Sequence, residues 1–387
     1  MTTTTFIHTS DFQLGMQRWF LTGEAQARFD DARLDSIKRL GELAERKGAE
    51  FIVVAGDVFE RNSLSSQVTG RAREALEKLP VPVFLLPGNH DPLVADSVFY
   101  TAVNQETAPD VRVISDTEPY KLRDGVEIVG APFKARTATY DLVADMLEPL
   151  EATDTIRVAV GHGQVHGWGD SEKLDSIDLN NVEDKIRNGV IDYLALGDTH
   201  STMELGNTGC VWFSGSPEPT DFKHLPAGGG ESDSGNALVV TIEKTSATQT
   251  SVTVDKEAIG QWVFESIEMD INSDEDVKRF IQQLQDYPDK HRTVIKYGLR
   301  GTINLAAQTT LDSEIEKLEP VFASLKPRQR VMDLHLAPEE DELANLNLTG
   351  FAASALQELM DDIDADPDSI SRDAANLLFR LTRKDAS

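Results

Sequence analysis

The sequence predicts a layered α/β fold, in which short buried strands alternate with helices. Short runs at 51–55, 156–160 and 193–196, apolar apart from Arg157, have the length and composition of buried strands. Residues 24–47 and 178–188 are predicted to be helices that fall between such strands. Strands that alternate with helices along a chain are typical of an α/β layered domain.

The helix over 24–47 shows the signals on which these assignments depend. Phe29, Ile37 and Leu40 recur at roughly helical spacing, and Gly48 follows as a residue that readily ends a helix. The other elements expected in the first half are a helix at 65–79, capped by Ser65 or Ser66, and strands at 6–8, 81–86, 111–114, 127–130 and 211–213.

Composition limits the class of protein. The 387 residues contain one cysteine, Cys210, which excludes an intrachain disulfide and a cysteine-based metal site. No apolar run reaches the length of a membrane span and no signal peptide is evident, so we expect a cytoplasmic protein without a membrane partner. The formal charge of −29 should repel nucleic acid on average. That charge is read mainly as a solubility or salt-adapted surface, and any polyanion would need a local patch, metal ions or a basic partner.

Changes in composition divide the chain into four expected segments. Residues 1–225 form the α/β domain, and the Gly- and Ser-rich stretch 226–235 is a linker. Residues 236–337 are expected to form a smaller α+β domain, and 338–387 a C-terminal helical segment. The elements expected in the smaller domain are strands at 237–244, 249–255, 262–271, 294–300 and 331–336 and helices at 273–287 and 310–325.

The C-terminal segment carries two predicted amphipathic helices. One has Phe351, Ala355, Leu359 and Ile363 on one face, and the other has Ile370, Ala374, Leu377, Leu378 and Leu381. Such short helices cannot bury an apolar stripe unaided, so they are expected to dock, either on the preceding domain or on a partner.

Polar clusters follow the predicted strands directly. They are Asp11, Gly56-Asp57, Gly88-Asn89-His90-Asp91, Gly161-His162 and Gly197-Asp198-Thr199-His200. Each alone is ordinary turn chemistry, since Gly, Asp and Asn are common after strands. Five at the carboxyl ends of strands in one domain point to a shared site, because those ends converge at one edge of a parallel sheet.

The order and spacing of these clusters resemble the five motifs of the calcineurin-like metallophosphoesterases. Within that superfamily, His8-Thr9-Ser10-Asp11 with Leu14-Gly15, the run Gly56-Asp57-Val58-Phe59-Glu60 and Ser214-Gly215-Ser216-Pro217 are similar to the SbcD-type DNA repair exonucleases. The resemblance covers roughly residues 5–222. It implies an αββα sandwich with a smaller α+β capping domain and C-terminal helices.

The resemblance also implies two divalent metal ions bridged by Asp57. One ion would take Asp11, Gln13 and His200, and the other Asn89, His162 and Asp198. His90 would lie outside the metal shell, beside the phosphate, as a catalytic group that stabilises the transition state or donates a proton. Asp91 would be a second member of the catalytic group that orients His90, or else a structural residue.

Two positions depart from the family pattern, which usually has histidine in place of Gln13 and of Asp198. Gln13 can still offer a neutral oxygen, although a weaker ligand than imidazole, and Asp198 offers an anionic oxygen. This shift towards oxygen ligands favours Mn²⁺, with Mg²⁺ as the alternative, over Zn²⁺. We therefore expect an active site with an altered metal preference.

The expected function is a metal-dependent DNA phosphodiesterase, a 3′→5′ exonuclease with endonuclease activity on single strands. The resemblance implies DNA, an SMC-like ATPase of the SbcC type and a second copy of the chain as partners. Alternatives are a phosphoesterase for small substrates such as cyclic nucleotides and a non-catalytic ATPase-regulating subunit with a degraded metal site. Candidate DNA contacts, each also explicable as an ordinary surface residue, are Arg18-Trp19-Phe20, Arg61-Asn62, Lys134, Arg136 and Lys223-His224.

Overall fold

The computed structural model describes residues 1–103, 108–166, 175–223, 230–336 and 350–365, together with 371, 374, 375 and 378. It divides into two compact units, Met1–Phe264 and Glu265–Ser387, which we call unit 1 and unit 2. None of the described helices combines the length and the apolar composition needed to cross a membrane.

Unit 1 contains two sheets, and the first has β1 near its centre. Its order is β12-β11-β1-β2-β3-β4, with β1 to β4 parallel and β11 antiparallel to both β1 and β12. Its strands are β1 (Thr2–Thr9), β2 (Phe51–Val54), β3 (Val83–Leu85), β4 (Val111–Val113), β11 (Asn236–Ser246) and β12 (Gln249–Ala258).

The second sheet has the order β5-β6-β7-β8-β10-β9. Its four central strands are parallel, and the two outer strands are antiparallel additions. Its strands are β5 (Tyr120–Arg123), β6 (Val126–Gly130), β7 (Ile156–His162), β8 (Tyr193–Gly197), β9 (Met203–Leu205) and β10 (Val211–Phe213). Every residue of β7 and β8 is buried, as expected for central strands of a covered sheet.

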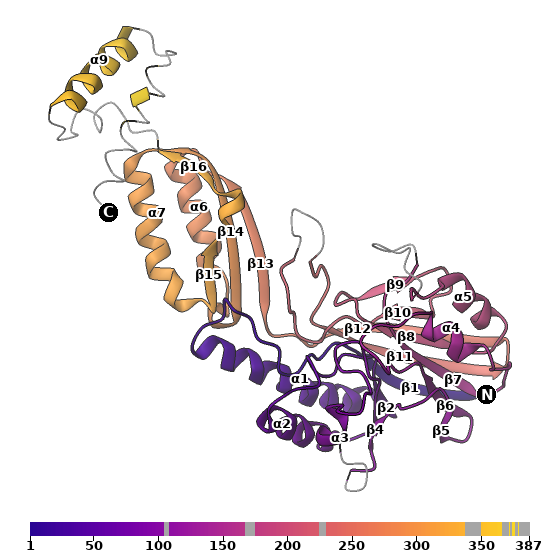
Figure 1. Cartoon of the computed structure of the whole chain (residues 1–387). Helices are drawn as coiled ribbons and strands as arrows, with labels where there is room; N and C mark the ends of the chain where they lie inside the picture. Colours follow the sequence, from indigo (N-terminus) through magenta and orange to yellow (C-terminus); the bar gives the residue numbers. More distant parts are fainter. Residues whose placement is uncertain are drawn as a thin grey trace. The chain divides into compact units, whose positions relative to one another are not determined.

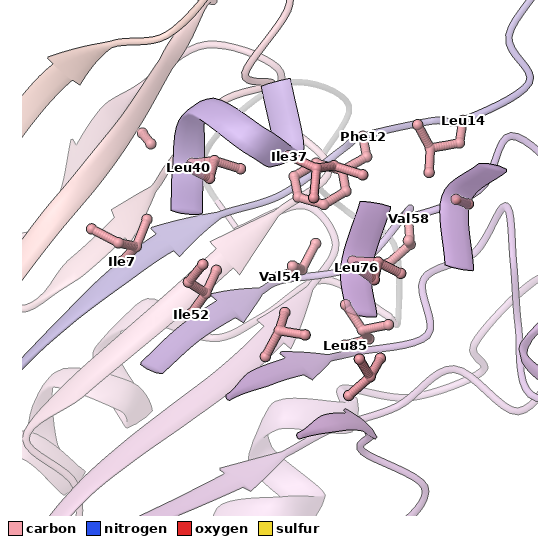
Figure 2. Close-up of a cluster of buried hydrophobic side chains, with 14 of the residues drawn as sticks. Ile7, Phe12, Leu14, Ile37, Leu40, Ile52, Val54, Val58, Leu76 and Leu85 are labelled. Carbon is pink, nitrogen blue, oxygen red and sulfur yellow. The ribbon is translucent and has the colours of Figure 1, made fainter. Parts of the chain in front are cut away.

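The two sheets of unit 1 pack face to face between helices. Phe6 and Phe51 of the first sheet share a core with Val158 and Tyr193 of the second. The outer face of the first sheet is covered by α1 (Glu24–Lys47) and α2 (Ser66–Glu77), as Figure 2 shows for Ile37, Leu40 and Leu76. The outer face of the second is covered by α4 (Leu142–Leu147) and α5 (Leu179–Arg187). These four layers, visible in Figure 1, confirm the predicted αββα sandwich.

The boundary between the units differs from the expected one. Strands β11 and β12, predicted to open the smaller domain, complete the first sheet of unit 1 instead. The physical reason is their packing: Leu238, Val240 and Ile242 of β11 enter the core between the two sheets. The stretch expected as a linker therefore leads back into the same unit, and its described part, 230–235, carries a buried glutamate, Glu231.

Unit 2 is a smaller α+β unit with one four-stranded sheet. Its elements are β13 (Val263–Asp270, which crosses the unit boundary), α6 (Asp274–Gln285), β14 (Thr293–Ile303), α7 (Leu305–Leu318), β15 (Ser324–Pro327), β16 (Asp333–Leu336) and α9 (Phe351–Ala365). The helix predicted at 310–325 was misplaced, because the chain ends α7 at Leu318 and turns through Pro320 into the parallel strand β15. Residues 338–348, which the sequence predicts to be an acidic loop, lie outside the described residues, as does most of the second helix predicted at 370–381.

Candidate metal centre

The structure brings the polar clusters of the sequence together at the carboxyl ends of parallel strands from both sheets. The first sheet contributes from the ends of β1, β2 and β3, and the second from β7 and β8. The residues placed there are Asp11, Gln13, Asp57, Asn89, His90, His162, Asp198 and His200. The convergence expected from the sequence is thus present in the fold.

Unusual backbone conformations mark this site. In the part of the chain that the structure describes, positive φ at a non-glycine residue occurs at Asp11 (54°), Gln13 (41°), Asp57 (51°) and Asp198 (99°). Such conformations cost of order 1–3 kcal/mol each and persist where the surroundings enforce them, typically at functional sites. All four belong to the predicted ligand set, which supports a functional reason for the strain.

Backbone pairing holds the first two of these loops against each other. Asp11 N donates to Gly56 O (3.0 Å), Gln13 N to Asp57 O (2.8 Å), and Leu14 N to Val58 O (2.9 Å). The apolar neighbours of Gln13, Phe12 and Leu14, are buried in the same core cluster as Ile37 and Leu40 of α1 (Figure 2). The loop is therefore anchored by its apolar residues, while Asp11 and Gln13 are left for the site.

One group of ligand atoms surrounds His162. Its Nε2 lies 3.4 Å from Asp57 Oδ1, 3.0 Å from Asn89 Oδ1 and 3.9 Å from Asp198 Oδ1. Its Nδ1 lies 2.8 Å from Ala55 O, and a carbonyl can only accept, so Nδ1 carries the proton. Nε2 is consequently the nitrogen that faces the acidic group, and once deprotonated it would direct its lone pair there, as a metal ligand requires.

A second group surrounds His200. Its Nε2 lies 3.9 Å from Asp11 Oδ1 and 3.2 Å from Gln13 Nε2. The carboxylate of Asp11 also accepts Asp198 N (3.2 Å) and the Ser10 hydroxyl (2.5 Å), which fixes its orientation. Asp11, Asp57 and His162 each offer one potential ligand atom, and these three atoms lie within 4.8 Å of one another. The groups around His162 and His200 therefore form one cluster.

Three side chains of the cluster, Asp11, His162 and His200, have raised pKa values and so hold protons that a bound cation would displace. Burial raises the pKa of Asp11 above its usual range. Burial disfavours the charged form of His162, but the negative charge of Asp57 outweighs it and raises the pKa of that imidazole well above its usual value. Burial also opposes charge on His200, yet a hydrogen bond to Glu231 and the charge of Asp11 raise its pKa to about 9. Metal binding there would release protons from these imidazoles.

Two buried oxygens test whether the residues fit a metal ion. Among the residues that the structure describes, Gln13 Oε1 and Asp198 Oδ2 are buried and find no hydrogen-bond partner. Buried polar atoms are nearly always satisfied, so such orphans call for a missing partner. Both are oxygens on the two residues that depart from the histidines expected by resemblance. The donor set therefore fits a divalent cation that accepts oxygen ligands.

Close approach at Gly56 and Gly88 requires glycine. A Cβ on Gly88 would lie 2.1 Å from Asp57 Oδ1, and a Cβ on Gly56, which has φ +94°, would lie 2.1 Å from His162 Nδ1. Any larger residue at either position would displace a predicted ligand. The glycines of these two motifs thus protect the position of the central carboxylate and imidazole.

His90 lies beside the cluster without joining it. Its N–H donates to Asp57 Oδ1 (3.1 Å), and its side chain is half-buried. Its Nδ1 lies 3.1 Å from Glu60 O, so Nδ1 is the donor there and Nε2 is left for another partner. This position agrees with the one expected for a group that faces a substrate.

Asp91 occupies a different position from the one expected of a catalytic group. It is fully buried, and its two oxygens accept the N–H groups of Gly88 (2.7 Å) and Phe59 (2.9 Å). A side chain so enclosed cannot touch a substrate. We therefore replace its catalytic assignment with a positioning role, in which it joins the turn after β3 to the loop after β2.

The weaker DNA-contact candidates separate into two kinds. Asn62 is structural, since its side chain donates to Pro92 O (3.0 Å) and accepts Val98 N (2.9 Å). Trp19 is 87% exposed, on a loop that Gln26 braces through Arg18 N (2.9 Å) and Met16 O (3.1 Å). Lys134, Arg136 and Lys223 are exposed, and His224 lies outside the described residues.

Sequence reasoning missed Glu231, which contacts the predicted ligand His200. Its Oε1 lies 2.7 Å from His200 Nδ1. A glutamate in a Gly- and Ser-rich stretch of a strongly acidic chain has no distinguishing signal, and only the fold reveals the contact.

Comparisons with known proteins agree with this geometry. A model of the family described as calcineurin-like phosphoesterase matches residues 4–202, which contain all the predicted ligands. The uncharacterized metallophosphoesterase YhaO of Bacillus subtilis (strain 168) is 25% identical over 387 residues, covering 94% of this chain and 88% of that protein. The SbcD component of the SbcCD nuclease of Staphylococcus epidermidis is 23% identical over 234 residues, covering 54% of this chain and 60% of that protein.

Two further similarities are more limited. The DNA double-strand break repair protein Mre11 of Archaeoglobus fulgidus is 34% identical over 98 residues, covering 24% of this chain and 21% of that protein. The crystal structure of TT1561 of Thermus thermophilus has a TM-score of 0.40 and 12% identity, covering 65% of this chain and 99% of that one. Since the family model spans just over half of the 387 residues, the chain belongs to the calcineurin-like phosphoesterases, metal-dependent hydrolases of phosphate esters.

Proposed function

We propose that the chain is a DNA phosphodiesterase, a 3′→5′ exonuclease with endonuclease activity on single strands. The observation that carries the hydrolytic part is the convergence of Asp11, Asp57 and His162, with two orphaned oxygens beside them. The preference for DNA is supported by two similar proteins, whose names are those of a nuclease component and a double-strand break repair protein.

Two divalent cations would be held by the seven predicted ligands. Asp57 would bridge them, with Asp11, Gln13 and His200 on one side and Asn89, His162 and Asp198 on the other. When bound, such ions would supply a water of lowered pKa and neutralise charge on the phosphoryl oxygens. The oxygen atoms of Gln13 and Asp198 favour Mn²⁺ or Mg²⁺ over Zn²⁺.

His90 would act directly on the substrate. With its Nδ1 proton donated to Glu60 O, its Nε2 is available for a phosphate oxygen or the leaving oxygen. In hydrolysis, water adds to phosphorus and releases one proton to solvent, and the bond from phosphorus to the leaving oxygen breaks. The leaving oxygen takes a proton from protonated His90, which regains one from solvent. Asp57 would help to orient this residue by accepting its backbone N–H.

A partner would ease the electrostatic cost of binding DNA to a chain with a formal charge of −29. We propose an SMC-like ATPase of the SbcC type as that partner, with a second copy of the chain, in the cytoplasm. The name of the staphylococcal relative, a component of SbcCD, supports this assembly.

Two alternatives make different predictions. YhaO covers most of this chain, and its name specifies no substrate, so a phosphoesterase for small substrates is the main competitor. A non-catalytic subunit would be expected only if Gln13 and Asp198 no longer hold metal.

One set of assays separates these functions. The purified chain, with and without its ATPase, would be given duplex DNA, single-stranded DNA and a small chromogenic diester, with Mn²⁺ or Mg²⁺. The proposal predicts cleavage of DNA and loss of it in His90→Ala. Cleavage of the small diester alone would favour the small-substrate alternative. Intact substrates together with no retained Mn²⁺ would favour the non-catalytic subunit.

A further inference from the structure

We infer that Glu231 is a positioning residue of the metal centre, which sets the tautomer of His200 and strengthens it as a ligand. The inference rests on the proposed metal site. It extends the site beyond the segment that matches the family, because Glu231 lies after residue 202. It also gives a function to a stretch that the sequence suggested was only a linker.

The contact itself fixes the tautomer of His200. Glu231 is 5% exposed, and its Oε1 lies 2.7 Å from His200 Nδ1. A carboxylate can only accept, so Nδ1 must carry the proton. Thr220 Oγ1 lies 2.9 Å from the same nitrogen and donates its own proton to Glu231. It can therefore only accept from His200 Nδ1, which agrees with a proton on that nitrogen. The Nε2 atom is left to face Asp11 and Gln13.

Glu231 is itself held so that it cannot turn away. Its Oε2 accepts Thr220 N (2.7 Å), and its backbone N–H donates to Phe222 O (3.2 Å). Two residues later, Asp233 O accepts Thr202 N (2.8 Å). The segment 231–233 therefore lies along the loop that carries His200, and contacts both the side chain of His200 and the backbone of Thr202.

The negative charge of Glu231 has a specific use in this chain. On its side of Asp57, the predicted metal site has Gln13, a weak neutral donor, where the family usually has histidine. A carboxylate that accepts the Nδ1 proton makes an imidazole a stronger donor through Nε2, and loss of such a partner typically weakens metal binding about 10- to 100-fold. Glu231 would thus offset the weaker ligand at Gln13.

Glu218 provides a matched control. It is also buried and lies in the same region of the chain, but it binds Arg39 and the backbone N–H groups of Gln261 and Trp262. Its carboxylate has no hydrogen bond to a predicted metal ligand. Removing its charge should affect stability without affecting the metal centre.

The test is a Mn²⁺ titration of the metal-free full chain, with free Mn²⁺ followed by electron paramagnetic resonance. The variants are Glu231→Ala, the near-isosteric Glu231→Gln, Glu218→Gln, His200→Ala and the double variant His200→Ala with Glu231→Ala. Circular dichroism and urea unfolding establish that each variant is folded. Glu231→Gln keeps the shape of the site if Glu231→Ala does not fold.

We expect two Mn²⁺ ions bound by the wild type, and one of them weakened about 10- to 100-fold in Glu231→Ala and several-fold in Glu231→Gln. Glu218→Gln should bind Mn²⁺ as the wild type does. The double variant should bind no more weakly than His200→Ala, because Glu231 acts through His200. Wild-type Mn²⁺ binding in both Glu231 variants, or further loss in the double variant, would overturn the inference alone. Absence of Mn²⁺ binding by the wild type would overturn the proposed metal site as well.

Discussion

Acid should unfold this protein partly through one buried histidine, His8, which lies between the two sheets of unit 1. Its Nε2 donates to Leu196 O in β8 (3.1 Å), and its Nδ1 accepts the hydroxyl proton of Tyr193 (3.0 Å). The ring is fully buried. Burial lowers the pKa of His8 from 6.5 to about 3, because a charged ring at this position would lose its hydration.

The magnitude follows from linkage between protonation and folding. The unfolded chain binds the His8 proton at about pH 6.5, whereas the folded chain resists it until about pH 3. The stability that neutral His8 contributes is therefore fully present above pH 6.5 and is lost as the pH falls towards 3. With about 1.4 kcal/mol per pKa unit, the loss between pH 7.5 and pH 5 is about 2 kcal/mol.

Urea unfolding at pH 7.5 and pH 5 of the wild type and of His8→Gln measures this term. Glutamine can donate and accept but does not titrate, so the variant loses some stability at both pH values. Its decrease between the two should be about 2 kcal/mol smaller than that of the wild type. An equal decrease in both proteins would refute the reasoning. A larger decrease in the variant would also refute it.

The remaining predictions concern the site and its substrate. Gly88→Ala should lower kcat for a chromogenic diester about 100-fold, because the added Cβ would displace Asp57. Gly70→Ala is the control and should leave kcat unchanged, because a Cβ there has open space. Equal kcat values for the two variants would contradict the close approach of Gly88 to Asp57. Asp91→Asn should lower the free energy of unfolding by about 1–3 kcal/mol, because the amide nitrogen cannot accept one of the two N–H groups, of Gly88 and Phe59, that Asp91 now accepts. Unchanged urea unfolding together with lost activity would restore a catalytic role for Asp91. Trp19→Ala should lower kcat/KM for single-stranded DNA about 5- to 150-fold without affecting the small diester, since base stacking contributes about 1–3 kcal/mol. An equal effect on both substrates would exclude stacking.

The clusters after the strands were predictable because their chemistry is local in the sequence. Asp57 and His162 each follow a short, mostly apolar run, and parallel strands bring such ends together. The signal that ends α1 is also local in the sequence: Gly48 follows the last helical residue and has the left-handed φ of 64° that a glycine at this position predicts. These signals depend on residues within one strand or one helical turn.

The parts that were not predicted depend on contacts between distant segments. Strand β11 begins with an apolar run that any buried strand could have. Nothing in that run specifies antiparallel pairing with β1, at the opposite end of unit 1 in the sequence. The role of Asp91 depends on Phe59 in another loop, and that of Glu231 on His200. Such long-range partners are set by the packing of the whole unit.

We propose that seven residues from five strand ends hold two metal ions around Asp57. Anomalous diffraction at the manganese edge, from crystals soaked in Mn²⁺, tests it most directly. Two peaks about 3.5–4 Å apart should flank Asp57, one beside Asp11, Gln13 and His200 and the other beside Asn89, His162 and Asp198. A single peak, or Mn²⁺ bound away from Asp57, would contradict the claim.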